Sequence, residues 1–307
     1  MSNTSSCYCS YGCCCCKLQP YTLPLPPTFK LPPNIIQLNP KDKILIQKAA
    51  ACLREAFLGS TFTAGAPIMT ETYYGKQSVD QPLDESTATD VGLGVFNNWL
   101  MNFTLHRNLP FGGVFVYVED AIKQKGRRSS KNMVVSSVAV SIPPNSLGWD
   151  VYKDYEPSVW GLSCCPWNCS SVGLPPPTVL CDCCYGSAER LRAIDKADVE
   201  MRHRVTADKK YWYLHALGTT PRLQKKGKAS ELVRVLSHLA DLENVPMYVE
   251  SGSHLNSLFY LKRGFIKKET IHAYPFSTSR ALLRLPNNCS SSVQSADISI
   301  GNAKDTI

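Results

Sequence analysis

Hydrophobic and polar positions alternate with two distinct periods in the last third of the chain. Apolar residues at helical spacing predict a helix at 228–242 and a shorter one at 256–263. Short apolar runs predict a strand that begins at Tyr211 and strands at 246–250, near 265–271 and near 280–285. Helices that alternate with strands are typical of an α/β layer fold.

The first two thirds of the chain are predicted to contain three helices and one β-hairpin. We expect the first helix to begin near Asn39, where a capping residue precedes proline, and to end before Gly59. Further helices are predicted at 91–107 and about 188–204. Apolar runs at 113–120 and 133–142 predict two strands joined by the basic segment KQKGRRSSKN.

Composition sets the limits of the folded domain. Prolines in YTLPLPPTFKLPPN forbid helix, so residues 1–38 are predicted to be a disordered Cys- and Pro-rich tail. The folded domain is expected to span 39–286, with a Cys-, Pro- and Trp-rich insertion at about 144–186. Residues 287–307 are rich in Ser and Asn and are predicted to be a second disordered tail.

Overall charge and hydrophobicity exclude several classes of protein. With 44% hydrophobic residues among 307, the chain can bury a sizeable core. Because it lacks an apolar run of roughly 18 residues and an apolar leader, we expect a cytoplasmic protein without a spanning helix. The charge of 33 − 25 = +8 favours an anionic partner: nucleic acid, a membrane surface or a phosphorylated cofactor.

Twelve of the 14 cysteines fall into two clusters, at 7–16 and 164–184. Such clustering is unlike a disulfide framework spread over a small fold. The second cluster could supply zinc ligands, but it lacks paired C-x2-C spacing, so we expect no metal. The run Cys13–Cys16 would attach the protein to a membrane if acylated. A plain disordered tail is the alternative.

The segment LHALGTTPRLQKKGKA, at 214–229, carries the chemistry. A predicted strand leads through a short loop into an amphipathic helix, with Gly227 and Ala229 at its first turn. Helix N-termini present free N–H groups and a positive dipole end, and small residues let a phosphate approach the backbone. Arg222, Lys225, Lys226 and Lys228 add positive charge. A diphosphate is the expected occupant.

These residues resemble a known signature. The sequence Gln224-Lys-Lys-Gly-Lys-Ala229 resembles the Q/R-x-x-G-x-G/A motif of the GNAT superfamily of acyl-CoA-dependent N-acetyltransferases. YWYLHALGTTP before it resembles the family's fourth strand, and VPMYVESGSHLNSLFYLKRGF after it resembles the fifth strand and the next helix. The resemblance covers 211–285 well and 39–143 loosely. It implies an α/β (α+β) fold whose mixed, mostly antiparallel, twisted sheet is splayed at strands 4 and 5 and flanked by helices.

The resemblance also implies an activity. A GNAT enzyme transfers an acetyl group from acetyl-CoA to a primary amine, of a small molecule or peptide, by direct attack in a ternary complex. Tyr260 stands where the family protonates the departing thiolate, and Glu250 is our candidate base. The expected cofactor contacts are Leu217, Gly218, Gln224, Lys225, Lys226, Gly227, Lys228, Ala229 and Asn256.

Each assignment has an alternative. Tyr260 could be a core residue, Asn256 a helix N-cap and Glu250 an exposed charge at a strand end. The protein could bind acyl-CoA as an inactive sensor or scaffold. It could instead be a basic module for nucleic acid or membranes, but its basic loops lack interleaved aromatic residues, so we expect no nucleic-acid partner.

Overall fold

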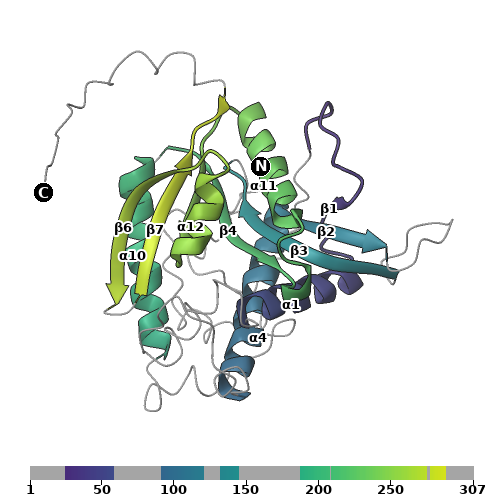
Figure 1. Cartoon of the computed structure of the whole chain (residues 1–307), viewed down its shortest axis with the longest axis horizontal. Coiled ribbons are helices and arrows are strands. Elements are labelled where there is room, and N and C mark those ends of the chain that lie inside the picture. The colour runs from purple at the N-terminus through teal and green to yellow at the C-terminus, as the bar shows by residue number, and fades with distance from the viewer. Residues whose placement is uncertain are drawn as a thin grey trace, which may run out of the picture.

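A seven-stranded sheet organises the computed structural model of the protein (Figure 1). The structure describes residues 25–58, 91–120, 132–144, 187–207, 209–274 and 277–287. The strands are β1 (Ile35–Gln37), β2 (Val114–Asp120), β3 (Met133–Ile142), β4 (Trp212–Thr219), β5 (Met247–Ser251), β6 (Ile266–Tyr274) and β7 (Ser277–Arg284). They lie in the order β1-β2-β3-β4-β5-β7-β6. Within these ranges, none of the helices combines the length and the apolar composition that crossing a membrane requires.

Only one pair of neighbouring strands is parallel. β4 and β5 run in the same direction, whereas all other neighbours are antiparallel. A parallel pair needs a crossover, which the helix between these strands supplies. The prediction of a mixed, mostly antiparallel sheet flanked by helices is therefore confirmed.

The folded part begins earlier than the sequence indicated. β1 pairs with β2 through Ile35 and Tyr117, although it lies inside the range predicted to be a tail. Leu38 is 1% exposed, and its N–H donates to the carbonyl of Val114 at 2.8 Å. The boundary at residue 39 is wrong because a strand of three residues beside prolines has too short an apolar pattern to be recognised.

The helices confirm the predicted positions. They are α1 (Lys43–Leu58), α4 (Val91–Asn108), α10 (Ser187–Thr206), α11 (Lys228–Leu242) and α12 (His254–Leu261), with short 3-10 turns at Leu109–Phe111 and Pro221–Leu223. α1 begins later than Asn39 because Asp42 is its cap: Asp42 Oδ1 accepts from Leu45 N–H at 3.0 Å. Asn39 instead bends the chain before the helix, accepting from Lys41 N–H at 2.9 Å.

Alternation along β3 shows which helices share a face of the sheet. Val138 and Val140 pack in a core cluster with α1 and α4, and Ile142, on the same face, packs with α10. Ala139 points the other way, into the cluster that includes α11. The face of the sheet covered by α10, α1 and α4 is called the α10 face. The opposite face, covered by α11 and α12, is called the α11 face (Figure 1). Tyr260 of α12 packs in the core cluster of the α11 face.

Several predictions lie outside the described residues. These are the two cysteine clusters, the basic segment KQKGRRSSKN apart from its last residue, the insertion from residue 145 and the tail from residue 288. The described residues contain no group of three or more His, Cys, Asp or Glu side chains placed to hold a metal ion.

Candidate functional site

The parallel strands β4 and β5 separate partway along their length. Their pairing ends at Leu214 and Val249, whereas β4 continues to Thr219 beside β3 alone. We call the region beyond Leu214 the split. On the β3 side the register shifts between Val140 and Ser141, so that β4 has one extra residue, His215, where the split begins.

Hydrogen bonding to β3 fixes which N–H groups face the split. Thr220 N–H donates to Ser136 across the ladder at 3.1 Å, and antiparallel partners alternate in the direction of their bonds. Gly218 N–H therefore points toward β3, and Leu217 N–H points toward the split. Among the described residues no strand pairs with Leu217 on that side. This placement suits the predicted contact of Leu217 with the cofactor.

Gly218 has a different role from the one predicted. A Cβ at this position would lie 2.9 Å from Ala56 Cβ and 3.1 Å from Leu53 Cδ2, so the missing side chain lets α1 approach β4. The Gly218 carbonyl accepts from Ser137 Oγ at 2.8 Å. Because its N–H also faces β3, Gly218 presents no donor to a cofactor in the split.

The predicted phosphate loop lies at the edge of the sheet where β4 ends. Gly227 is the N-cap of α11 with φ 80°, a left-handed conformation, and no side chain caps the helix. The N–H groups of the first turn, from Lys228 to Ser230, are thus open to an anion. A Cβ at Gly227 would meet no atom within 4 Å. Gln224 Nε2 donates to the carbonyl of Thr219 at 3.2 Å, which joins the loop to the end of β4.

The basic side chains around the loop divide into two groups. Arg222, Lys225 and Lys226 are on the surface of the loop, and Lys225 has a left-handed φ of 60°. Lys228 is 8% exposed and forms an ion pair with Glu119 of β2. Burial lowers the pKa of Lys228. The predicted charge of Lys228 is therefore directed away from the loop, and only its backbone N–H is available to a phosphate.

Asn256 is not the cap of α12. Ser253 is the N-cap, and its Oγ accepts from Asn256 N–H at 3.0 Å. The cap was misplaced because the sequence offers two polar candidates three residues apart. Asn256 lies half-buried in the first turn of α12, immediately after β5. A contact of its side chain with the cofactor stays a prediction.

Tyr260 lies on the α11 face, in the same core cluster against which Leu217 packs. It is 7% exposed, and its ring meets those of Phe259 and Phe265 edge to face, with centroids 5.1 and 5.4 Å away. Burial raises the pKa of Tyr260, against a smaller opposite effect of Arg263, so the phenol stays protonated at neutral pH. Arg263 also donates to Ser230 Oγ and so connects α12 to the first turn of α11.

A polar cluster lies on the α10 face of the split. Arg202 Nε of α10 is 3.0 Å from Glu250 Oε1, and both side chains are at most 10% exposed. The same guanidinium donates to Tyr213 Oη at 3.1 Å and lies 4.1 Å from the centre of its ring. Tyr213 Oη is in turn 3.2 Å from His215 Nδ1. Glu250 is therefore a buried partner of Arg202, and the alternative of an exposed strand-end charge is wrong.

Asp198 completes this cluster, one turn of α10 before Arg202. Its Oδ1 is buried and accepts no hydrogen bond from the described residues. Burial, and next the negative charge of Glu250, raise the pKa of Asp198 to about 8, while Ser279 and Arg202 act in the opposite direction. The cluster holds two carboxyl groups and one guanidinium, and Arg202 pairs with Glu250, so Asp198 is the less neutralised acid of the two.

This pKa predicts that Asp198 destabilises the fold progressively as the pH rises from about 4 to about 8. An unfolded Asp ionises near pH 3.9, so between about pH 4 and 8 the native state holds a proton that the unfolded state has lost. Stability then falls as pH rises, by at most about 1.4 kcal/mol per pH unit. Asp198→Asn should remove that loss. We expect its stabilising effect, measured by urea unfolding, to grow from pH 5 to pH 8; an effect constant with pH would contradict the raised pKa.

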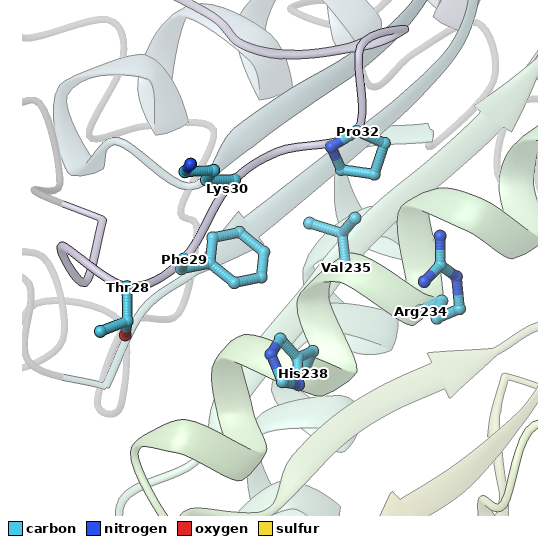
Figure 2. Close-up of a pocket in the computed structure, with 7 residues that line it drawn as sticks. All are labelled: Thr28, Phe29, Lys30, Pro32, Arg234, Val235 and His238. Atoms are coloured by element: carbon cyan, nitrogen blue, oxygen red, sulfur yellow. The ribbon is translucent and has the colours of Figure 1, made fainter.

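A hollow of about 330 Å³ lies elsewhere on α11, between this helix and the N-terminal segment (Figure 2). Its lining residues are Thr28, Phe29, Lys30, Pro32, Arg234, Val235 and His238. The ring of Phe29 lies 5.3 Å from that of His238. No residue of the phosphate loop or of the split contributes to its lining, so it is separate from the candidate site.

Comparison with known proteins gives distant structural likenesses. No family model and no curated protein matches the chain. Arylalkylamine N-acetyltransferase 2 from Aedes aegypti is 13% identical with a TM-score of 0.48, over 82% of this chain and 98% of that one. A polyamine N-acetyltransferase from Drosophila melanogaster is 12% identical with a TM-score of 0.44, over the same shares. The mosquito arylalkylamine N-acetyltransferase-like 5b is 10% identical with a TM-score of 0.45, over 82% and 99%.

These structural neighbours are acetyltransferases. With identities and TM-scores this low, these likenesses assign no role to any residue, and the site rests on the geometry of this chain. The separation of β4 and β5 begins beside the polar cluster of the α10 face, and β4 then leads through the loop to the open N-terminus of α11 on the other face.

Proposed function

We propose that the protein is a GNAT-type N-acetyltransferase that uses acetyl-CoA to acetylate a primary amine. One observation carries the proposal: an uncapped helix N-terminus with a left-handed glycine lies at the edge of the sheet where β4 leaves β5. The first feature suits a diphosphate, and the second provides a backbone N–H for a thioester. Acetyl-CoA contains both groups.

The diphosphate would bind the N–H groups of Lys228 and Ala229, with Lys225 and Lys226 around it. The pantetheine arm would follow the split, which places the thioester oxygen at Leu217 N–H. That oxygen gains negative charge in the transition state. One donor of this kind is typically worth about 3 kcal/mol, because it is already oriented when the charge develops.

The reaction needs no covalent enzyme intermediate. A neutral amine attacks the thioester carbonyl carbon, the carbon–sulfur bond breaks, and the electron pair leaves with sulfur as the CoA thiolate. Tyr260 would give its proton to that sulfur and regain one from the nitrogen of the product. The acceptor would reach the carbonyl from the α10 face, because the cofactor would occupy the α11 face.

The role of Tyr260 predicts a separation of kcat from affinity. Tyr260→Phe should lower kcat by about 10²-fold, the low end for general acids, because a thiolate of pKa near 8.5 leaves fairly well unaided. The affinity for acetyl-CoA should change little, since the ring still packs between Phe259 and Phe265. Steady-state kinetics and calorimetry measure the two effects. A variant that melts early but keeps kcat would identify Tyr260 as a core residue only.

Turnover distinguishes the enzyme from an inactive acyl-CoA sensor. The full chain is incubated with acetyl-CoA and a panel of primary amines, including diamines, arylethylamines, amino acids and peptides, and the products are weighed by mass spectrometry. We expect at least one amine to gain one acetyl group with release of an equal amount of CoA. Tight acetyl-CoA binding without any acetylated amine would favour the sensor.

A further inference from the structure

A carboxylate of α10 faces the split from the side opposite the proposed cofactor. On β5, Tyr248 packs in the α10-face cluster and Val249 in the α11-face cluster, so Glu250 lies on the α10 face. Glu250 is one residue past the last β4–β5 pair. Asp198 interacts with Glu250 and with Ser279, which lies on β7 one residue past the last β5–β7 pair, Ser251 with Arg280. Asp198 is therefore level with the first residues of the split.

The neighbours of Asp198 determine what the cluster can do. Glu250 is held by Arg202, and Tyr213 and Tyr248 are buried neutral phenols whose pKa burial raises. On β6, Glu269 also faces α10 but pairs with Arg204 at 2.7 Å. Nδ1 of His215 lies within hydrogen-bond distance, 3.2 Å, of the hydroxyl of Tyr213. Asp198 Oδ1 and Tyr248 Oη are the two buried oxygens of these described groups without a hydrogen bond. Of the two, only the Asp198 oxygen belongs to an acid that can ionise near neutral pH, because burial keeps the phenol of Tyr248 neutral.

We propose that Asp198 is the catalytic base that takes the proton from the acceptor ammonium, with Arg202 positioning Glu250 beside it. The proposal rests on the proposed function, because it assigns the α10 face of the split to the amine. A cationic amine supplies the hydrogen-bond donor that Asp198 Oδ1 lacks, and a positive charge that Asp198 does not have to share with Glu250. The site as a whole holds two carboxylates and one guanidinium, so it selects an acceptor that enters as a cation.

The proton balance is complete with groups of this chain and solvent. One N–H bond of the ammonium breaks, its proton passes to the Asp198 carboxylate, and the electron pair stays on nitrogen for the attack. The nitrogen then loses a second proton, and Tyr260 relays this proton to the CoA thiolate. Asp198 then returns its proton to solvent, so each turnover gives an amide, CoA thiol and one proton.

Asp198 serves this role better than Glu250. The carboxylate of Glu250 is already engaged by the guanidinium of Arg202, 3.0 Å away. A group whose pKa lies near the working pH is an effective proton acceptor. Ionised Asp198 is required, so kcat/KM should rise with pH through about 8 in the free enzyme. A bound ammonium stabilises the carboxylate, so the same rise in kcat should occur at lower pH.

The test compares Asp198→Asn with Glu200→Gln, a change at an exposed residue of the same helix that likewise converts a carboxyl group into an amide. The acceptor is the best amine from the turnover panel. We expect Asp198→Asn to lower kcat by 10²–10⁴-fold and to abolish the rise near pH 8, with acetyl-CoA affinity unchanged by calorimetry. Glu200→Gln should keep the wild-type profile. Asp198→Ala should regain activity in formate, which replaces the missing carboxylate.

Each contrary outcome has a distinct meaning. If Asp198→Asn keeps the wild-type kcat and pH profile, the base is elsewhere, although the acetyltransferase activity stands. If it loses acetyl-CoA affinity or melts early together with the loss of kcat, and formate does not rescue Asp198→Ala, Asp198 has a structural role and the inference is wrong. If the wild type acetylates no amine of the panel, the proposed function fails, and this inference fails with it.

Discussion

Replacing Gly227 with Glu is expected to lower the affinity for acetyl-CoA by at least about 100-fold, which corresponds to about 2.7 kcal/mol. Two effects add. A non-glycine residue at φ 80° is strained by about 1–2 kcal/mol, which favours a different loop conformation. The new carboxylate would also stand where the diphosphate binds, with the same sign of charge. Calorimetry with acetyl-CoA measures the loss.

Gly264 offers a matched control. It follows α12 with φ 82°, and the nearest atom to a Cβ there would be Arg284 Nε at 4.0 Å. Gly264→Glu therefore introduces the same strain and charge, but beside Arg284, which pairs with Asp241 near the far end of α11. Acetyl-CoA should bind this variant with nearly wild-type affinity. Equal affinity of the Gly227→Glu variant and the wild type would show that the diphosphate does not bind at α11.

Replacing Arg202 with Met is expected to destabilise the fold by about 3–5 kcal/mol at pH 7, the usual cost of leaving one member of a buried ion pair without its partner. Glu250 would then face Asp198 and two phenols without a cation. Urea unfolding measures the loss. Arg204, on the same helix, is the matched control. It also pairs with a carboxylate, that of Glu269 on β6, but its side chain is 52% exposed. Arg204→Met should cost about 1 kcal/mol or less.

A second substitution separates charge from packing. In the Arg202→Met background, Glu250→Gln removes the unpaired charge and should recover a large part of the lost stability. No recovery would mean that Arg202 acts mainly by packing against the ring of Tyr213.

Local sequence patterns were sufficient for most of the fold and for the phosphate loop. α11 has its predicted bounds, since its apolar stripe is regular and Gly227 marks its start. Gly227 and Leu217 are recognisable because a continuous stretch of chain forms both the strand and the loop. β1 was missed for the opposite reason: its three residues are a strand only because β2 is beside them.

The α10 face of the site could not be predicted in the same way. Asp198 and Glu250 are about fifty residues apart, and the sequence offers no motif that brings them together. Asp198 resembles any polar residue of an amphipathic helix until α10 is packed against β6 and β7. The side-chain charge of Lys228 was misplaced for a related reason, because its ion-pair partner Glu119 lies on a strand more than a hundred residues earlier.

A crystal structure of the full chain with acetyl-CoA tests the central claim most directly. The account predicts the diphosphate within hydrogen-bond distance of the N–H groups of Lys228 and Ala229, and the thioester oxygen at Leu217 N–H, with the acetyl group facing Asp198. Acetyl-CoA bound instead in the hollow between Lys30 and His238, with the split empty, would contradict it.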